Sequence, residues 1–165
     1  MNLRKEMLIA QISSCSTEQT WFASLDVALK GVTAEQAVWH DGSFENSIVE
    51  IVKHLIFWNE RCLQEFSGQS VSDEEFTNQS TFFKEHSKEL TDAEWNETII
   101  RLQNVFARWE TAIKECDEEM LDSFAHPDRP WWRQISNMLL HTAHHSGQII
   151  YLRKRNGSWN PVKWD

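Results

Sequence analysis

Apolar residues recur every three or four positions along four long stretches of the chain, the spacing of one face of an α-helix. The stretches predict helices over residues 2–30, from 43 or 46 to 66, from 91 to about 116, and from 131 or 132 to about 155. Ser13, Ser14 and Ser16 weaken the middle of the first helix, because serine side chains compete for backbone hydrogen bonds. We therefore expect a break or a bend there.

Polar residues indicate where two of these helices begin. Thr91 followed three positions later by Glu94 forms a capping box, in which each side chain bonds the other residue's backbone amide. Ser43, Asn46 or Ser47 offers an N-cap for the second helix. A glycine follows the first, second and fourth helices and favours their termination.

The connections between the helices differ in length. Residues 67–90 are polar with scattered phenylalanines, and they predict a long crossover that contains a short helix over about 76–89. Residues 117–130 form a second loop, and an extended tail follows Gly157 and docks through Trp159 and Trp164. We therefore expect a single all-α domain over residues 1–165, a four-helix bundle with a longer crossover between its second and third helices.

Charge and composition exclude several classes of function. The net charge is −9, and the only basic cluster, Arg153 to Arg155, suits the last turn of a helix, so we expect no nucleic-acid binding. No apolar run is long enough to span a membrane, and the first residues lack the apolar core of a signal peptide. The three cysteines are widely spaced, so we expect a reduced, cytoplasmic protein.

Three histidines fall on the apolar side of predicted helices. His141 and His145 are four positions apart and share one helical face, and His54 lies in the apolar stretch of the second helix. A buried imidazole needs a hydrogen-bond partner or a metal. These residues are therefore either core histidines with hydrogen-bond partners or metal ligands. Three imidazoles with an open fourth position are typical of a catalytic zinc-type site, whereas four protein ligands indicate a structural one.

Other polar residues near these histidines have two interpretations each. Glu50 could accept a hydrogen bond from the second nitrogen of His54, or it could be an exposed helix carboxylate. Trp58 could line a pocket or pack in the core, and His40 could be a fourth ligand or belong to a capping segment. The remaining histidines and two helical cysteines are expected to have no role at the site: His86, His126, His144, Cys62 and Cys116. No nucleophile elbow, P-loop or dinucleotide motif is present.

Two segments of the sequence resemble one family. The stretches "IVKHLIFWNERCL" and "LLHTAHHSGQIIYLRKRNG" are similar to the DinB/YfiT-like superfamily of metalloenzymes, and together they cover about a fifth of the chain. The resemblance implies a four-helix bundle with metal ligands at His54, His141 and His145. It also implies that Gly147 permits close helix packing and that Gln148 bonds beside the site. Ser146 stands where many members have arginine.

The resemblance also implies a class of chemistry. Characterised relatives include transferases and isomerases that use a low-molecular-weight thiol, and others are described as metal-dependent hydrolases. We therefore expect a metal-dependent enzyme that acts on a small molecule, with a thiol or a water as the nucleophile. Zinc is the expected metal, and imidazole ligands also suit nickel, iron and copper.

A second hypothesis has no catalysis. The chain would then be a helical bundle with a stabilising metal or a vestigial site, acting as a stress-linked binding or dimerisation module. A tryptophan-rich surface formed by Trp131, Trp132, Trp159 and Trp164 would be its partner face. We expect a homodimer under either hypothesis, because two-fold homo-oligomers are the commonest assemblies.

Overall fold

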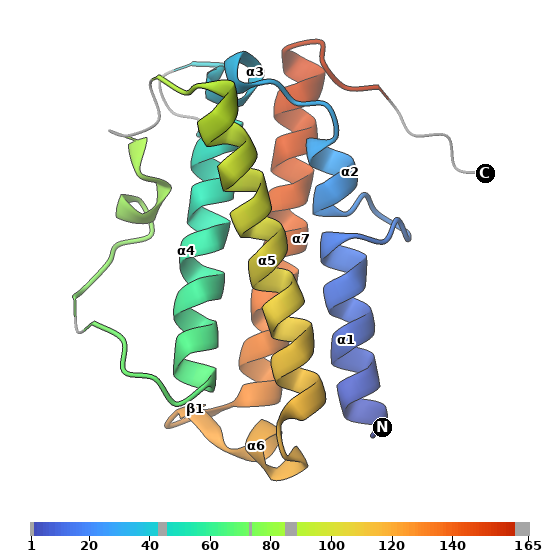
Figure 1. The fold of residues 1–165 in the computed structure, drawn as a ribbon, viewed down its shortest axis with the longest axis vertical. Helices are drawn as coiled ribbons and strands as arrows, with labels where there is room; N and C mark the ends of the chain where they lie inside the picture. Colours follow the sequence, from blue (N-terminus) through green and yellow to red (C-terminus); the bar gives the residue numbers. More distant parts are fainter. Residues whose placement is uncertain (1, 43–45, 73, 85–88, 161–165) are drawn as a thin grey trace.

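Four long helices lie side by side in the computed structural model, which describes residues 2–42, 46–72, 74–84 and 89–160 (Figure 1). They are α1 (Leu3–Ser16), α4 (Ile48–Phe66), α5 (Asp92–Glu115) and α7 (Trp131–Arg155). Helices α1 and α4 each pack against both α5 and α7. The apolar stripes of the four helices therefore face one another and form a shared core, in which Trp109 of α5 is completely buried.

The predicted starts and ends of the three later helices are confirmed. Ser47 caps α4, and the Thr91–Glu94 capping box begins α5 as expected. Ser43 lies outside the described residues. Gly68 and Gly157 follow α4 and α7 with φ angles of 71° and 75°, the left-handed conformation that glycine adopts at a helix end.

The first predicted helix is broken in the region where a break or a bend was expected. Helix α1 ends at Ser16, and the short helix α2 (Leu25–Leu29) starts only after an irregular segment. The hydroxyls of Ser14 and Ser16 donate to the carbonyls four residues earlier, at 2.8 Å each. Such bonds destabilise a helix end. A further short helix, α3 (Ala34–Val38), has its own capping box and was not predicted.

The prediction of a short helix over about residues 76–89 of the crossover is wrong for the described residues of that segment. Residues 80–82 form only a single 3₁₀ turn, η1 (Ser80–Phe82). The Thr77 hydroxyl accepts from the Ser80 amide, and Phe83 then adopts a left-handed conformation with φ of 50°, so the turn cannot propagate as a helix. The four residues from 85 to 88 lie outside the described part of the chain.

The expectation of an entirely α-helical chain is corrected in the loop before α7. This loop contains a short helix, α6 (Glu118–Asp122), and a two-stranded antiparallel sheet of β1 (Phe124–His126) and β2 (Arg129–Pro130). Pro127 and Asp128 connect the two strands. Both residue types favour tight turns, because proline fixes φ and aspartate bonds its neighbouring backbone.

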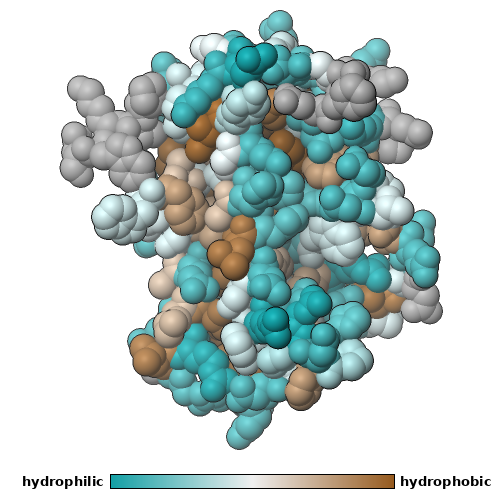
Figure 2. Space-filling view, turned by 180° about the vertical axis from the view of Figure 1, so that it is seen from behind, coloured by the Kyte–Doolittle hydropathy of each residue, from teal (hydrophilic) through white to brown (hydrophobic). Residues whose placement is uncertain are grey.

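The predicted tryptophan-rich surface is only partly present. Trp131 is 5% exposed and packs edge-on against Phe66, so it belongs to the core. The Trp159 ring covers the Arg153 guanidinium at 5.2 Å, and Trp164 lies outside the described residues. On α7 the exposed large apolar side chains are Trp132, Leu140 and Tyr151. Figure 2 views the molecule from the α7 side, where hydrophobic side chains form separate patches among hydrophilic ones.

A helix that spans a membrane must be long and predominantly apolar. Within the described ranges, none combines the length and the apolar content that crossing a lipid bilayer requires.

The capping box of α5 gives a direct test of this local structure. We expect Thr91→Ala to lower the free energy of unfolding by about 1 kcal/mol, because the Glu94 amide loses the Thr91 hydroxyl that accepts its hydrogen bond. Thr111→Ala is the matched control, since Thr111 is exposed on the same helix and bonds only the Ala107 carbonyl. Urea unfolding of both variants would measure the difference, and equal stability of the two would contradict the role of the cap.

Candidate metal centre

Helix α4 carries His54 into the interior of the protein. The residue has 0% of its surface exposed, because position 54 belongs to the apolar face that also includes Ile51 and Leu55. The ring of Phe82, from η1, stacks on the imidazole with centroids 4.1 Å apart and planes 3° apart. The crossover therefore fixes the plane of His54 from a segment that is 28 residues away in sequence.

Helix α7 carries the other two histidines of the cluster. His141 and His145 lie one turn apart on the face that meets α4, with ring centroids 4.4 Å apart and planes perpendicular. His145 is 5% exposed, whereas His141 is half-buried. The prediction that both residues share the apolar face of this helix is confirmed.

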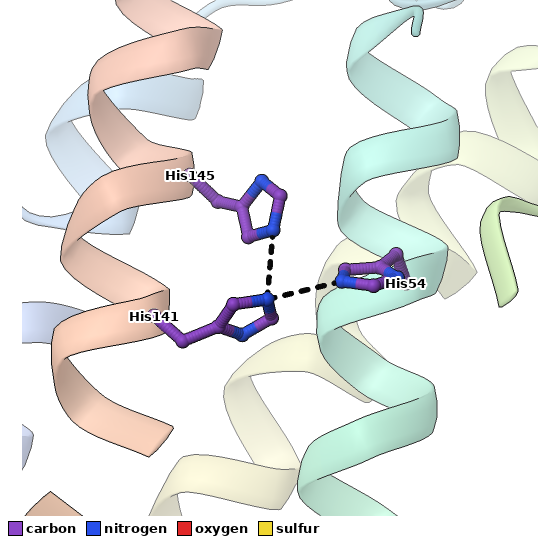
Figure 3. Close-up of side chains that lie close together, drawn as sticks. All are labelled: His54, His141 and His145. Carbon is purple, nitrogen blue, oxygen red and sulfur yellow. Dashed lines mark hydrogen bonds between the residues drawn. The ribbon is translucent and has the colours of Figure 1, made fainter. Parts of the chain in front are cut away.

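The three imidazoles point their Nε2 atoms toward one another (Figure 3). The Nε2 atom of His141 lies 3.1 Å from that of His54 and 2.9 Å from that of His145. One nitrogen from each residue lies within 4.8 Å of the nitrogens of the other two, an arrangement that could hold a metal ion. Zinc–nitrogen bonds of 2.0–2.1 Å in a tetrahedral site separate ligand nitrogens by roughly 3.3 Å, a little more than the two separations that involve His141.

Hydrogen bonds on the outer nitrogens determine the tautomers of two of these rings. The Thr81 hydroxyl donates to the Asn78 carbonyl, so its oxygen accepts from Nδ1 of His54, 2.7 Å away. The Gln148 side-chain oxygen can only accept, and it lies 2.7 Å from Nδ1 of His145. Both histidines therefore carry their proton on Nδ1, which leaves a bare lone pair on each Nε2.

These tautomers make the centre of the cluster an electron-rich point. Two Nε2 lone pairs, from His54 and His145, both face Nε2 of His141. A neutral His141 has at most one proton there and can donate one linear hydrogen bond. The three nitrogens therefore cannot satisfy one another, and a cation between them would resolve the conflict. This donor set is the chemistry that a transition metal requires.

Burial keeps the histidines neutral at ordinary pH. Desolvation, followed by the proximity of His145 and His141, lowers the pKa of His54 to about 3. Desolvation and His141 lower the pKa of His145 to about 4, and desolvation also lowers the pKa of His141. Protons therefore compete weakly for these nitrogens near pH 7.

The remaining polar residues near the site have other partners. Glu50 is buried, and its carboxylate accepts from the Ser47 amide at 2.8 Å and lies 3.4 Å from Nε2 of His40. The structure thus places Glu50 in the cap of α4, while Thr81 is the partner of His54. Gln148 lies beside His145 and also donates to His144, 3.1 Å away.

Other residues singled out from the sequence fall outside the cluster. Trp58 is half-buried and meets the His54 ring edge-on at 6.4 Å. Ser146 is buried and donates to the Ala23 carbonyl, which fixes the α1–α2 connection against α7. A side chain at Gly147 would meet nothing within 4 Å, so the expectation of close helix packing there is wrong. His126 is exposed on β1, and His86 lies outside the described residues.

Sequence reasoning missed two residues of the site. Thr81 and Phe82 lie in an irregular polar segment, where no periodicity indicates which side chains are buried. Their contacts with His54 depend on how the crossover folds back on α4. The spacing of the histidines along the sequence does not predict how the crossover folds back on α4.

The cysteines have the properties of structural thiols. Burial raises the pKa of Cys15 to about 11 and that of Cys62 to about 12. Burial also raises the pKa of Cys116, the C-cap of α5. None of the three therefore carries an activated thiolate near pH 7.

The lowered histidine pKa values predict how stability depends on pH in the metal-free protein. Because the native pKa values lie below 6.5, the unfolded chain binds more protons, and stability is lost as the pH falls from about 6.5 toward 3. By pH 5 each of the most shifted imidazoles should cost up to about 2 kcal/mol. Urea unfolding between pH 5 and 8 with a chelator present would measure this slope. His54→Phe should remove about half of this slope, since His145 still contributes, and His126→Ala should leave it unchanged. A flat wild-type profile would contradict the assignment.

The chain matches one family of known proteins. A family model of the DinB superfamily matches residues 16–149, a span that includes all three clustered histidines. Searches of curated proteins and of solved structures found no match. The resemblance drawn from the two histidine segments is confirmed, since the match covers most of the chain. The chain belongs to the DinB superfamily.

Proposed function

We propose that this protein is a four-helix bundle that works as a metal-dependent enzyme on small molecules, with His54, His141 and His145 as the metal ligands. One observation supports the proposal above the others. Two imidazoles from different helices are fixed as Nδ1–H tautomers and direct bare Nε2 atoms at a third imidazole. This arrangement has unfavourable internal electrostatics unless a cation lies at its centre.

The number of ligands favours catalysis over a structural role. Among the described residues, the group of potential ligands at this point consists of three histidines. A structural zinc site is usually closed by four protein ligands, whereas a catalytic site leaves a position open. With an open position, the bound metal would lower the pKa of a thiol or a water and so supply a nucleophile at neutral pH.

The residues around the histidines have separate tasks in this proposal. Thr81 and Gln148 keep two ligating nitrogens deprotonated and aimed, which is the role that outer hydrogen-bond partners have at metal sites. Phe82 stacks on His54 and excludes water from that side. His141 is the most exposed of the three ligands, so the substrate would approach from its side.

The metal and the nucleophile are further parts of the proposal. Three neutral imidazoles with an open position are typical of a catalytic zinc site, so we propose zinc, and nickel, iron or copper would also be accepted. With a low-molecular-weight thiol as the nucleophile the protein would be a thiol transferase, and with water it would be a hydrolase. Substrate screens run with and without added thiols would separate these two reactions.

Metal analysis is the first test of the proposal. Protein purified without a histidine tag should contain about one transition metal per chain by mass spectrometry, and His54→Ala and His145→Ala should each lose it. His126→Ala is the matched control, because this histidine is exposed and lies outside the cluster. Wild-type protein that is folded and remains metal-free after loading would refute the metal site.

The hydrogen bond that Gln148 accepts from His145 gives a second, graded test. Gln148→Leu should weaken metal affinity by about 10- to 100-fold, because His145 loses the acceptor that fixes its tautomer. Gln148→Glu keeps an acceptor at this position and should retain most of the affinity. Competition with a chelating dye would measure both dissociation constants, and equal losses in the two variants would contradict the role of the acceptor.

A further inference from the structure

A large cavity lies directly beside His141. Its volume is about 860 Å³, within the roughly 300–1,000 Å³ that small-molecule sites occupy. Helices α4 and α7 form two walls, residues 74–78 of the crossover form a third, and the β1–β2 hairpin closes the end. Since His141 and Trp58 both line it, the cavity connects the solvent with the histidine cluster.

Arg129 is the cationic side chain of this cavity with unused donors. It lies on β2, is half-buried, and donates from one terminal nitrogen to the Gln134 side-chain oxygen at 2.9 Å. In the described part of the chain, no carboxylate forms an ion pair with it. A guanidinium offers five N–H donors in a planar fork that matches a carboxylate.

The second arginine of the cavity has a structural role. Arg61 lies 3.7 Å from the Glu65 carboxylate, donates to the Ser72 carbonyl at 2.9 Å, and lies 5.8 Å from the centre of the Phe76 ring. These contacts hold the crossover against α4. Arg61 therefore shapes the wall of the cavity, while Arg129 remains available to a ligand.

Neighbouring side chains hold Arg129 in place. Gln134 accepts from the guanidinium with its oxygen, and its amide nitrogen lies 3.9 Å from the Cys62 sulfur, which sets the orientation of the amide. Asn137, one helical turn before His141, also lines the cavity and provides a further amide donor. Donors thus lie along the wall between the hairpin and the histidine cluster.

The acidic residues of the cavity differ from Arg129 in burial. Glu74 and Glu75 lie on the exposed crossover, where water and salt screen their charges. Glu65 is paired with Arg61. The half-buried guanidinium is screened less, so it determines which charge is bound inside the cavity.

We propose that this cavity binds a small organic carboxylate, with the carboxylate on Arg129 and the opposite, reactive end beside His141. This inference rests on the proposed function, because it names the substrate class for the same histidine site. Arg129 is then a specificity-determining residue for ligands of that class.

Thiols with and without a carboxylate test this assignment in the metal-loaded protein. The probes are mercaptocarboxylates with two to five methylene groups and mercaptoalcohols of the same lengths, each bound to the cobalt-loaded protein and followed by the sulfur-to-cobalt absorption band. The best mercaptocarboxylate should bind about 10-fold or more tightly than its alcohol counterpart, because it gains a charge-assisted bidentate contact. Equal affinities at every length would overturn the proposal.

Three variants assign the preference to one side chain. Arg129→Gln should abolish the preference for the carboxylate, and Arg129→Lys should keep part of it. Arg108→Gln, an exposed position on α5 with the same charge change, should leave it intact. Circular dichroism of each variant checks that the fold is kept. A preference that survives Arg129→Gln in folded protein would overturn the assignment.

A separate measurement distinguishes failure of this inference from failure of the metal proposal. If the folded protein retains no cobalt after loading, as measured by mass spectrometry, the metal proposal has failed. In that case, or if bound cobalt gives no sulfur band with any probe, the carboxylate site is tested alone in metal-free protein. Pentanoate should shift the NMR signals of the Arg129 side chain in wild type, whereas pentanamide should not. Absence of that shift would overturn the carboxylate site as well.

Discussion

At the α4–α7 interface, the Nε2 atoms of three imidazoles face one another with fewer protons than their hydrogen bonds would need. Thr81 and Gln148 each accept one N–H on the outer side of a ring, and in doing so they force lone pairs into the centre. Buried polar groups without partners are costly, so the interface would be a weak point of an otherwise apolar core. A cation at the centre, as in the metal site proposed above, would accept these lone pairs and remove that cost.

The same lone pairs explain why the irregular crossover matters to the site. The segment around η1 contributes both the hydroxyl that orients His54 and the ring that stacks on it. Its backbone is fixed locally by Thr77 and Ser80, and it is fixed to α4 through Arg61, which donates to the Ser72 carbonyl. The long connection between the second and third long helices is therefore part of the site's construction, and the aim of His54 depends on its path.

The sequence predicted those parts of the structure that depend on local chemistry. Helices α4, α5 and α7 follow from apolar periodicity and from caps such as Thr91 with Glu94, because both operate over a few residues. The position of His141 and His145 on one face of α7 follows from their i, i+4 spacing for the same reason. Glu50 illustrates the limit: its spacing from His54 suggested a contact, but the capping interaction with Ser47 occupies its carboxylate. Thr81 could not be found, since its contact with His54 spans 27 residues through a segment without periodicity.

The unfavourable electrostatics of the histidine cluster and the metal binding proposed for it have the same physical origin. In the metal-free fold the Nε2 lone pairs of His54 and His145 face Nε2 of His141, and burial suppresses the protonation that would relieve their repulsion. A ligand that binds only the folded chain adds stability in proportion to the logarithm of its concentration over its dissociation constant. A metal at this point would thus stabilise α4 against α7 and at the same time leave an open coordination position on the cavity side. Because Arg129 lies in the same cavity on the separate β1–β2 hairpin, ligand preference could change there without altering the helices that carry the histidines.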